Sequence, residues 1–345
     1  MINNKIHEQK TQNWQEFVNT LDHKTNTSRL YKTLNSITLS NSNTTHSHAA
    51  IITTTDNLPS NRQQANTLIN HFAQTSHLTS HPDDRRTIRR KKDFPTDSDY
   101  TPFNDIQTKH IIHNLKHSSA CGPDNISNIH LKHIGPQGIH ALTNIANYSY
   151  SHNTIPDIWK HGKIITIPKP NKDPTIPTSH RPITLLCTPS KIIERLILQL
   201  ITPHIPLADS QHGFRPLHST NTLLINLTQR ILDGINSDRP HHRTLLITLD
   251  ISKAFDAIPR HNLTNKIYNT DMHNNTKRWL ANYLAGRNAY VSYNGQSSHT
   301  RNINNGVPQG SVLSPTLFNL YMRDIPTPDT PEIQTSSYAD DITIT

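Results

Sequence analysis

The chain is most apolar at TLLITLDISKAFDAI, residues 244–258. Apolar residues recur there at every second position, which predicts a β-strand buried on at least one face. Asp250 falls near the end of this strand. A buried carboxylate without a partner costs several kcal/mol, so we expect Asp250 to be paired, protonated or bound to a metal ion. The residues from Ser252 to Pro259 predict a short helix that the proline ends.

A second acidic stretch is SSYADDITIT, Ser336 to Thr345. Strand-like residues flank Asp340 and Asp341, which predicts a β-hairpin with the two acids at its turn. Adjacent carboxylates repel, so we expect a positive partner beside them. Alternate strand residues point to opposite faces, so at most one of the pair needs to face a given ligand squarely. An ordinary Asp-containing turn also fits this doublet.

A third stretch, NNGVPQGSVLSPTLFNLYMRDI, covers residues 304–325 and predicts a loop followed by a helix. Gly310 allows a close backbone approach, and Gln309 offers both a hydrogen-bond donor and an acceptor. A purely structural loop also fits this stretch by itself. Upstream, KIITIPKP (163–170) predicts a strand, and TPSKIIERLILQLI (188–201) predicts a helix. A second helix is predicted for residues 220–235, with an apolar side made of Leu223, Leu224, Leu227, Ile231 and Leu232.

Composition suggests a basic protein with two domains. The length of 345 residues fits about two domains. The 34 Lys and Arg residues exceed the 25 Asp and Glu residues, for a net charge of +9. A polyanionic partner explains this charge, and so does a basic surface kept for solubility. The run RRTIRRKK, residues 85–92, fits a nuclear address, a nucleic-acid patch or a solvated linker.

Cysteine usage and hydropathy bear on the compartment. Cys121 and Cys187 are the only cysteines and have no metal-ligand spacing, so neither a disulfide framework nor a zinc site is predicted. The start of the chain has no apolar signal core, and no apolar run approaches the ~20 residues that cross a bilayer. We therefore expect a protein of the cytoplasm or nucleus, not secreted and without a transmembrane segment.

The acidic and loop stretches together resemble the palm of the reverse transcriptases of non-LTR retrotransposons, of the LINE and Jockey-like kind. The resemblance covers the chain from about residue 110 to its end. The matching motifs are, in chain order, ACGPDNISNIHLKHI, IPKPNKDP, HRPITLLCTPSKIIERLI, QHGFRP, LDISKAFDAI, GVPQGSVLSPTLFNLY and YADD.

The resemblance implies an α+β polymerase right-hand fold. Residues 101–345 would hold the fingers and most of the palm, with the thumb missing, because only four residues follow YADD. Residues 1–100 would form a partly disordered helical and linker extension. Apolar spacings predict short helices near residues 14–21 and 65–72 of that extension, joined by a Thr, Ser and Asn-rich linker.

The resemblance also implies catalytic and metal-binding roles for Asp250, Asp340 and Asp341. In two-metal catalysis, divalent ions about 3.5 to 4 Å apart activate the attacking hydroxyl and neutralise charge on the leaving group. Mg²⁺ prefers oxygen ligands, and Mn²⁺ is an alternative ion. Asp250 and Asp340 are the principal ligands implied, with Asp341 assisting.

Nucleotide binding is implied for Arg181, Lys172, Phe255, Gln309 and Gly310. The planar fork of Arg181 suits triphosphate oxygens. Phe255 would exclude a 2′-hydroxyl by collision, which selects deoxynucleotides. Gln309 and Gly310 would pack against the nucleotide. Without the flanking motifs, Phe255 would be taken as a core residue. For Lys172, a solvated lysine fits equally well.

Nucleic-acid binding is implied for Lys169 and Arg215. For Lys169, a solvated lysine fits equally well. Arg215 in HGFRP either meets the template backbone or braces the fingers, and the sequence leaves both open.

The implied function is RNA-directed DNA polymerase, acting on an RNA template, a DNA primer and deoxynucleoside triphosphates. One alternative is a catalytically incompetent nucleic-acid-binding remnant that lacks the thumb. Another is a different templated polymerase that uses the same palm.

Several family glycines are replaced here by Asn125, Asn171 and Leu217. Asparagine tolerates a left-handed backbone best after glycine, so the first two turns are expected to survive. Leucine has no such tolerance.

Overall fold

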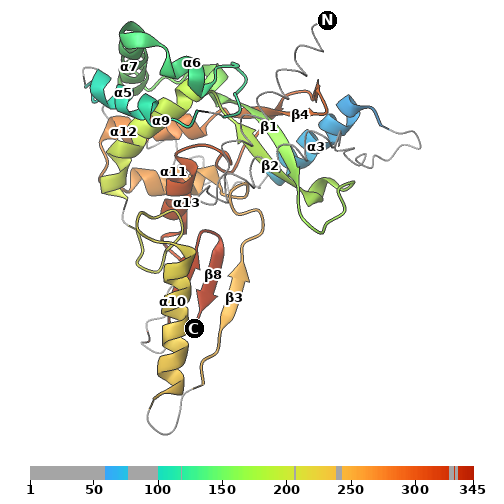
Figure 1. Ribbon diagram of the computed structural model, residues 1–345, viewed down its shortest axis with the longest axis vertical. Helices are drawn as coiled ribbons and strands as arrows, with labels where there is room; N and C mark the ends of the chain where they lie inside the picture. Colours follow the sequence, from blue (N-terminus) through green and yellow to red (C-terminus); the bar gives the residue numbers. More distant parts are fainter. Residues whose placement is uncertain are drawn as a thin grey trace, which may run out of the picture. The chain divides into compact units, whose positions relative to one another are not determined.

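The computed structural model gives two sheets and a helical core (Figure 1). All described residues belong to the compact unit Ala50–Thr345. The helix predicted near residues 14–21 and the basic run at 85–92 lie outside the described part, as does most of the predicted linker. The described residues are 59–76, 100–117, 119–205, 207–237, 243–325, 330 and 333–345.

The first sheet forms around an antiparallel hairpin, β1 and β2, and has the strand order β2-β1-β4-β5, with β6 also pairing β4. β1 confirms the strand predicted from residues 163–170 and lies parallel to β4. The strands are β1 (His161–Pro168), β2 (His180–Leu185), β4 (Asn288–Tyr293), β5 (Gln296–Ser297) and β6 (Arg301–Asn302).

Helix α3 (Asn61–Thr75) packs against this sheet and confirms the helix predicted near residues 65–72. Its apolar stripe includes Leu68 and Ile69, both 0% exposed, which form one core with Val291 of β4. Ser60 caps the helix by accepting a hydrogen bond from the Gln63 amide. Part of the segment expected to be an extension is therefore packed on the first sheet.

The main core surrounds α9 (Thr188–Ile201), whose bounds are those predicted from the apolar spacing. Ile192, Leu196 and Ile197 of this helix are each 0% exposed. None of the described helices has both the length and the apolar character needed to cross a bilayer. The other helices of this region are α5 (Asp105–His113), α6 (Asn128–Lys132), α7 (Gly135–Ser151), α8 (Asp157–Lys160), α11 (Arg260–Tyr268), α12 (Asn274–Leu284) and α13 (Ser314–Met322), with 3-10 turns η2 (Pro177–Ser179) and η3 (Thr202–His204).

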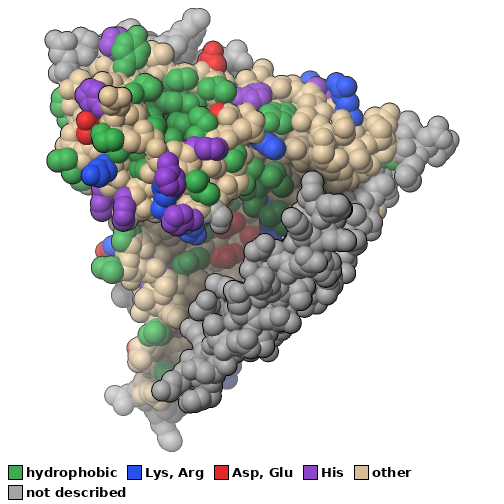
Figure 2. Space-filling view, turned by 45° about the horizontal axis from the view of Figure 1, so that its top comes forward, with side chains coloured by type: hydrophobic (Ala, Val, Ile, Leu, Met, Phe, Trp, Pro, Cys, Tyr) green, Lys and Arg blue, Asp and Glu red, His purple; other side chains and the backbone are tan. Residues whose placement is uncertain are grey.

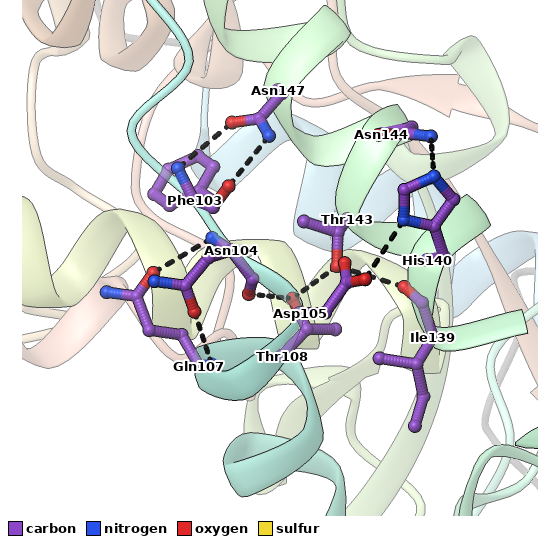
Figure 3. Close-up of polar contacts among 10 residues, drawn as sticks. All are labelled: Phe103, Asn104, Asp105, Gln107, Thr108, Ile139, His140, Thr143, Asn144 and Asn147. Atoms are coloured by element: carbon purple, nitrogen blue, oxygen red, sulfur yellow. Dashed lines mark hydrogen bonds and ion pairs between the residues drawn. The ribbon is translucent and has the colours of Figure 1, made fainter. Parts of the chain in front are cut away.

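A polar seam holds α5 against α7 (Figure 3). The Asn147 side chain bonds the backbone of Phe103 twice, accepting from its N–H at 3.0 Å and donating to its carbonyl at 2.9 Å. Thr143 donates to Thr108 in a buried contact of 2.9 Å. Together these contacts fix the start of the helical region onto α7.

The second sheet has the strand order β3-β8-β7 and is antiparallel throughout. β7 (Thr335–Tyr338) and β8 (Asp341–Ile344) form the predicted hairpin, and β3 (Ile247–Asp250) pairs with β8. Helix α10 (Thr220–Ile235) lies alongside β7 (Figure 1).

Three predictions of burial and structure in this region are wrong. β3 is exposed along its whole length, because it is an edge strand that pairs only with β8 among the described strands. Of the predicted apolar side of α10, only Leu223 is buried, and Leu224 is 57% exposed. Residues 252–257 form turns and no helix, since Lys253 takes a left-handed conformation with φ of 55°.

The substituted glycine positions keep left-handed backbones. Asn125 has φ of 55° and Asn171 has φ of 59°, as predicted for asparagine in such turns. Leu217 also has φ of 63°, and its side chain is fully exposed. Leu217 therefore adopts a conformation that L-residues avoid without gaining packing in return.

Leu217→Gly should raise the free energy of unfolding by about 1 kcal/mol, because a left-handed non-glycine residue costs about 1–2 kcal/mol and glycine's unfolded-state entropy offsets part of this. Urea unfolding followed by circular dichroism measures the change. Leu217→Ala keeps the Cβ atom and should stay within about 0.5 kcal/mol of wild type. An equal gain in both variants would mean that the exposed leucine side chain, and not the backbone, is the source.

Candidate active site

A cavity of about 740 Å³ lies between the β1–β2 hairpin, the loop before α13 and the hairpin turn after β7. In the space-filling view, acidic side chains are visible in a hollowed part of the surface (Figure 2). Eight of the ten residues predicted for the site line the cavity, and Asp341 and Arg215 do not. The eight are Lys169, Lys172, Arg181, Asp250, Phe255, Gln309, Gly310 and Asp340.

The register of the second sheet brings the predicted acids together. Asp250 of β3 stands directly opposite Asp341 of β8. Asp340 precedes Asp341 and lies in a tight turn with Ala339, whose φ is 57°. Directly opposed residues have Cβ atoms about 5 Å apart. The predicted convergence of the two acidic stretches is therefore present in the backbone.

The three carboxylates nevertheless do not form a closed cluster. Asp250 and Asp341 are exposed, and Asp340 is half-buried. In the described residues, no group of three or more His, Cys, Asp or Glu side chains is arranged to hold a metal ion. Because β3 is exposed, Asp250 carries no large desolvation cost, so the argument that burial forces a partner on it does not apply.

The β1–β2 hairpin brings three cations to the cavity: Lys169, Lys172 and Arg181. Arg181 on β2 lies opposite Ile167 of β1, and both Arg181 and Lys172 are exposed. Lys169 donates from Nζ to the Thr178 carbonyl at 3.0 Å, which fixes its side chain across the hairpin. Lys172 and Arg181 are therefore the cations of this hairpin with the greatest freedom to meet an anion.

Phe255 packs against the core with one face and also lines the cavity. It is half-buried, stacks on Phe318 of α13 with ring centroids 4.7 Å apart and an interplanar angle of 16°, and lines the cavity. Phe214 meets it edge-on at 5.8 Å. The ring is thus held rigidly from behind, as a steric barrier requires.

Gln309 and Gly310 are packed tightly against β2. The Thr184 amide donates to the Gln309 carbonyl at 2.8 Å. Gly310 has φ of 117°, and a Cβ atom there would lie 2.5 Å from the Thr184 carbonyl oxygen. The close approach predicted for this glycine is therefore present, and its neighbour is the backbone of β2.

Asp256 is a cavity residue that the sequence analysis missed, although it follows Phe255 directly. The Gln309 side-chain amide donates to Asp256 Oδ2 at 3.0 Å. Burial raises the pKa of Asp256 to about 6, against the lowering effects of the Gln309 bond and the Lys253 charge. Asp256 thereby fixes the side chain of Gln309 in the cavity.

Two arginines, the half-buried Arg260 and the buried Arg287, also line the cavity and carried no recognisable signal in the sequence. Arg260 donates to the carbonyls of Gly306 at 2.8 Å and Ile303 at 2.6 Å. Burial, with the nearby charge of Arg287, lowers the pKa of Arg260 to about 9. Arg287 stacks over the Tyr283 ring at 4.8 Å. Both arginines fasten the elements behind the cavity.

Arg215 makes its contacts within its own loop, and none of them reaches the β1–β2 hairpin. It donates to the Ala208 carbonyl at 3.1 Å and lies 3.5 Å from an Asp209 carboxylate oxygen, away from the cavity. Its loop supports the acidic turn, because a Cβ atom on Gly213 would lie 2.2 Å from the amide nitrogen of Ala339. The QHGFRP motif therefore backs the turn that carries Asp340.

The raised pKa of Asp256 predicts a pH-dependent effect of Asp256→Asn. The Asp256 carboxyl keeps its proton up to about pH 6 in the folded chain, but only up to its ordinary pKa of 3.8 in the unfolded chain. Proton binding by Asp256 therefore stabilises the fold of the wild type at low pH, and this contribution is lost as the pH rises through about 6. Relative to wild type, Asp256→Asn should therefore gain stability between about pH 4.5 and pH 7.5 in urea unfolding.

Asp173→Asn is the matched control. Asp173 is fully exposed, and hydrogen bonds from Thr175 lower its pKa, so its titration lies below the tested range. Its stability difference from wild type should stay flat over the same range. A flat difference for Asp256→Asn as well would contradict the burial of its carboxylate.

Comparison with known proteins agrees with these motifs. The reverse transcriptase (RNA-dependent DNA polymerase) family matches residues 167–345, just over half of the chain. The "Probable RNA-directed DNA polymerase from transposon X-element" of Drosophila melanogaster is 35% identical over 261 residues, which are 72% of this chain and 28% of that protein. The "RNA-directed DNA polymerase from mobile element jockey" of the same species is 31% identical over 253 residues, 69% of this chain and 27% of that protein.

The chain thus spans less than a third of the length of these relatives. A solved structure of apo telomerase from Candida tropicalis aligns at 14% identity with a TM-score of 0.36, over 55% of this chain and 44% of that one, which is too low to bear on the fold. The family match and the ordered motifs around one cavity lead to one conclusion: the chain belongs to the reverse transcriptase family, of the non-LTR retrotransposon kind.

Proposed function

We propose that this chain carries the catalytic residues of an RNA-directed DNA polymerase, which adds deoxynucleotides to a DNA primer paired with an RNA template. The supporting observation is the pairing of β3 with β8, which sets Asp250 opposite Asp341 with Asp340 in the adjoining turn. Lys172 and Arg181 line the same cavity as Asp250 and Asp340. Acids for metal ions and cations for a triphosphate therefore share one space.

The donor set fits divalent metal ions, which reverse transcriptases use as a family. Asp250 and Asp340 both line the cavity, and Mg²⁺ usually takes one or two carboxylates together with waters and substrate phosphates. Two bound Mg²⁺ ions would supply activation of the primer hydroxyl and neutralisation of the pyrophosphate leaving group. Asp341, opposite Asp250, is placed to assist from the neighbouring strand.

The remaining residues bind and orient the nucleotide. Arg181 and Lys172 are exposed cations that attract the triphosphate, and the planar guanidinium offers two parallel donors. Gln309 is oriented by its bond to Asp256. Phe255, backed by Phe318, limits the space at the 2′ position of the sugar.

Asp250→Asn and Asp340→Asn should each reduce primer extension on a poly(rA) template with Mg²⁺ by about 10³-fold, equivalent to about 4 kcal/mol of lost transition-state stabilisation. The control is Asp233→Asn, an exposed acid of α10 that does not line the cavity, which should stay within about twofold of wild type. If no variant and not even wild type extends a primer, while RNA binding is retained, the chain is a binding remnant and the catalytic proposal fails.

Phe255→Ala should lower the preference for deoxynucleotides over ribonucleotides by about tenfold or more, because a steric barrier at the 2′ position is removed. Competitive incorporation of dTTP and UTP opposite poly(rA) measures this ratio. Phe103→Leu is the control and should leave the ratio unchanged, since Phe103 packs edge-on against Tyr150 and does not line the cavity. An unchanged ratio in Phe255→Ala would reduce Phe255 to a core residue.

A further inference from the structure

A buried carboxylate lies behind the candidate site without lining it. Glu194 of α9 is 0% exposed, and hydrogen bonds hold both of its carboxylate oxygens. Its Oε1 accepts from Ser190 Oγ at 3.1 Å. Its Oε2 accepts from Ser311 Oγ and from the Val312 amide, both at 2.8 Å. A buried carboxylate is costly and is retained only where several donors satisfy it.

Ser311 connects this carboxylate to the surrounding helices. Its hydroxyl donates to Glu194 and accepts from the Tyr283 hydroxyl at 2.8 Å. It also accepts from the amides of Leu313 at 3.1 Å and Ser314 at 3.3 Å, where α13 begins. Because α13 carries Phe318, the same contact sets the helix on which Phe255 stacks. Ser311 is thus a junction with every hydrogen-bonding capacity used.

The loop that contains Ser311 is held from its other side by the fingers. Thr184 of β2 bonds the Gln309 carbonyl, and Asp256 accepts from the Gln309 side chain. Only two residues separate these contacts from Val312. The segment 307–313 is therefore fixed at one end by the cavity wall and at the other by Glu194.

We propose that Glu194 is a positioning residue for nucleotide binding, because it fixes the loop 307–313 on which Gln309 and Gly310 line the cavity. This inference rests on the proposed function, since it assigns the nucleotide to the same cavity. Glu194 acts through Ser311 and Val312 and touches no substrate.

The hydrogen bonds of Glu194 allow a substitution that removes its charge and keeps its contacts with the loop. Both loop contacts reach the same oxygen, Oε2, so the amide oxygen of a glutamine can accept both. The amide nitrogen would then face the Ser190 hydroxyl, which can accept from it. Glu194→Gln should therefore keep the loop in place, whereas Glu194→Leu, of similar size, removes every contact.

The first measurement is the affinity of the purified 345-residue chain for a fluorescent deoxynucleoside triphosphate, at a temperature where circular dichroism shows each variant folded. Glu194→Leu and Ser311→Ala should weaken binding by about tenfold or more, because displacement of a positioning group by about 1 Å costs up to 10²-fold. Glu194→Gln should stay within about threefold of wild type. Ser190→Ala is the matched control: it removes a bond to the same carboxylate without touching the loop, and binding should not change.

Affinity for an RNA–DNA primer duplex, measured on the same proteins, should be unaffected in all four variants. General loosening of the core would weaken both affinities together and would overturn the assignment of a positioning role.

The second measurement is amide hydrogen exchange without nucleotide, which does not depend on the proposed function. Protection of the Val312 amide should fall in Glu194→Leu and persist in Glu194→Gln and Ser190→Ala. If wild type binds no nucleotide, the proposed function fails, and the exchange result alone decides whether Glu194 holds the loop. Unchanged Val312 protection in Glu194→Leu, or wild-type nucleotide affinity in Ser311→Ala, would overturn the inference.

Discussion

The pairing of β3 with β8 is the constraint on which the candidate site depends. Backbone hydrogen bonds between these strands place Asp250 opposite Asp341, and a slip of one residue would move every side chain of β3 to the other face. The loop before α10 reinforces this register. The His212 amide donates to the Ser337 carbonyl at 2.8 Å, and Gly213 lies against the turn at Ala339. Three separate chain segments therefore hold the acidic turn.

Charges in this protein divide into an exposed set and a buried set with different tasks. The acids Asp250 and Asp341 are exposed, so water solvates both carboxyl groups and burial costs them little. The second set, Arg260 and Arg287 in the cavity wall and Glu194 behind it, is satisfied by neutral partners. Arg260 and Arg287 donate to backbone carbonyls, and Glu194 accepts from hydroxyls and an amide. Such groups hold the walls in place, while the exposed charges remain open to solvent.

Sequence patterns predicted local elements well and burial poorly in the second sheet. The spacing in α9 determines its bounds because one wide apolar face must be covered, and the core covers it. The same reasoning applied to β3 and α10 was wrong, since no described element covers Leu249 or Leu224. An apolar side chain tends to be buried. Whether it is buried depends on which other elements the tertiary structure packs against it.

The sequence by itself determined the residue types of the site, their order and the turns that carry them. It placed Asp250 at a strand end, Asp340 in a hairpin turn and a glycine at position 310, because local periodicity and backbone sterics act over a few residues. Only the tertiary structure decided that Arg215 braces a loop, and that Asp256 and Glu194 hold Gln309 and its loop. These roles depend on contacts between distant segments, whose distances and burial exist only after the chain has folded.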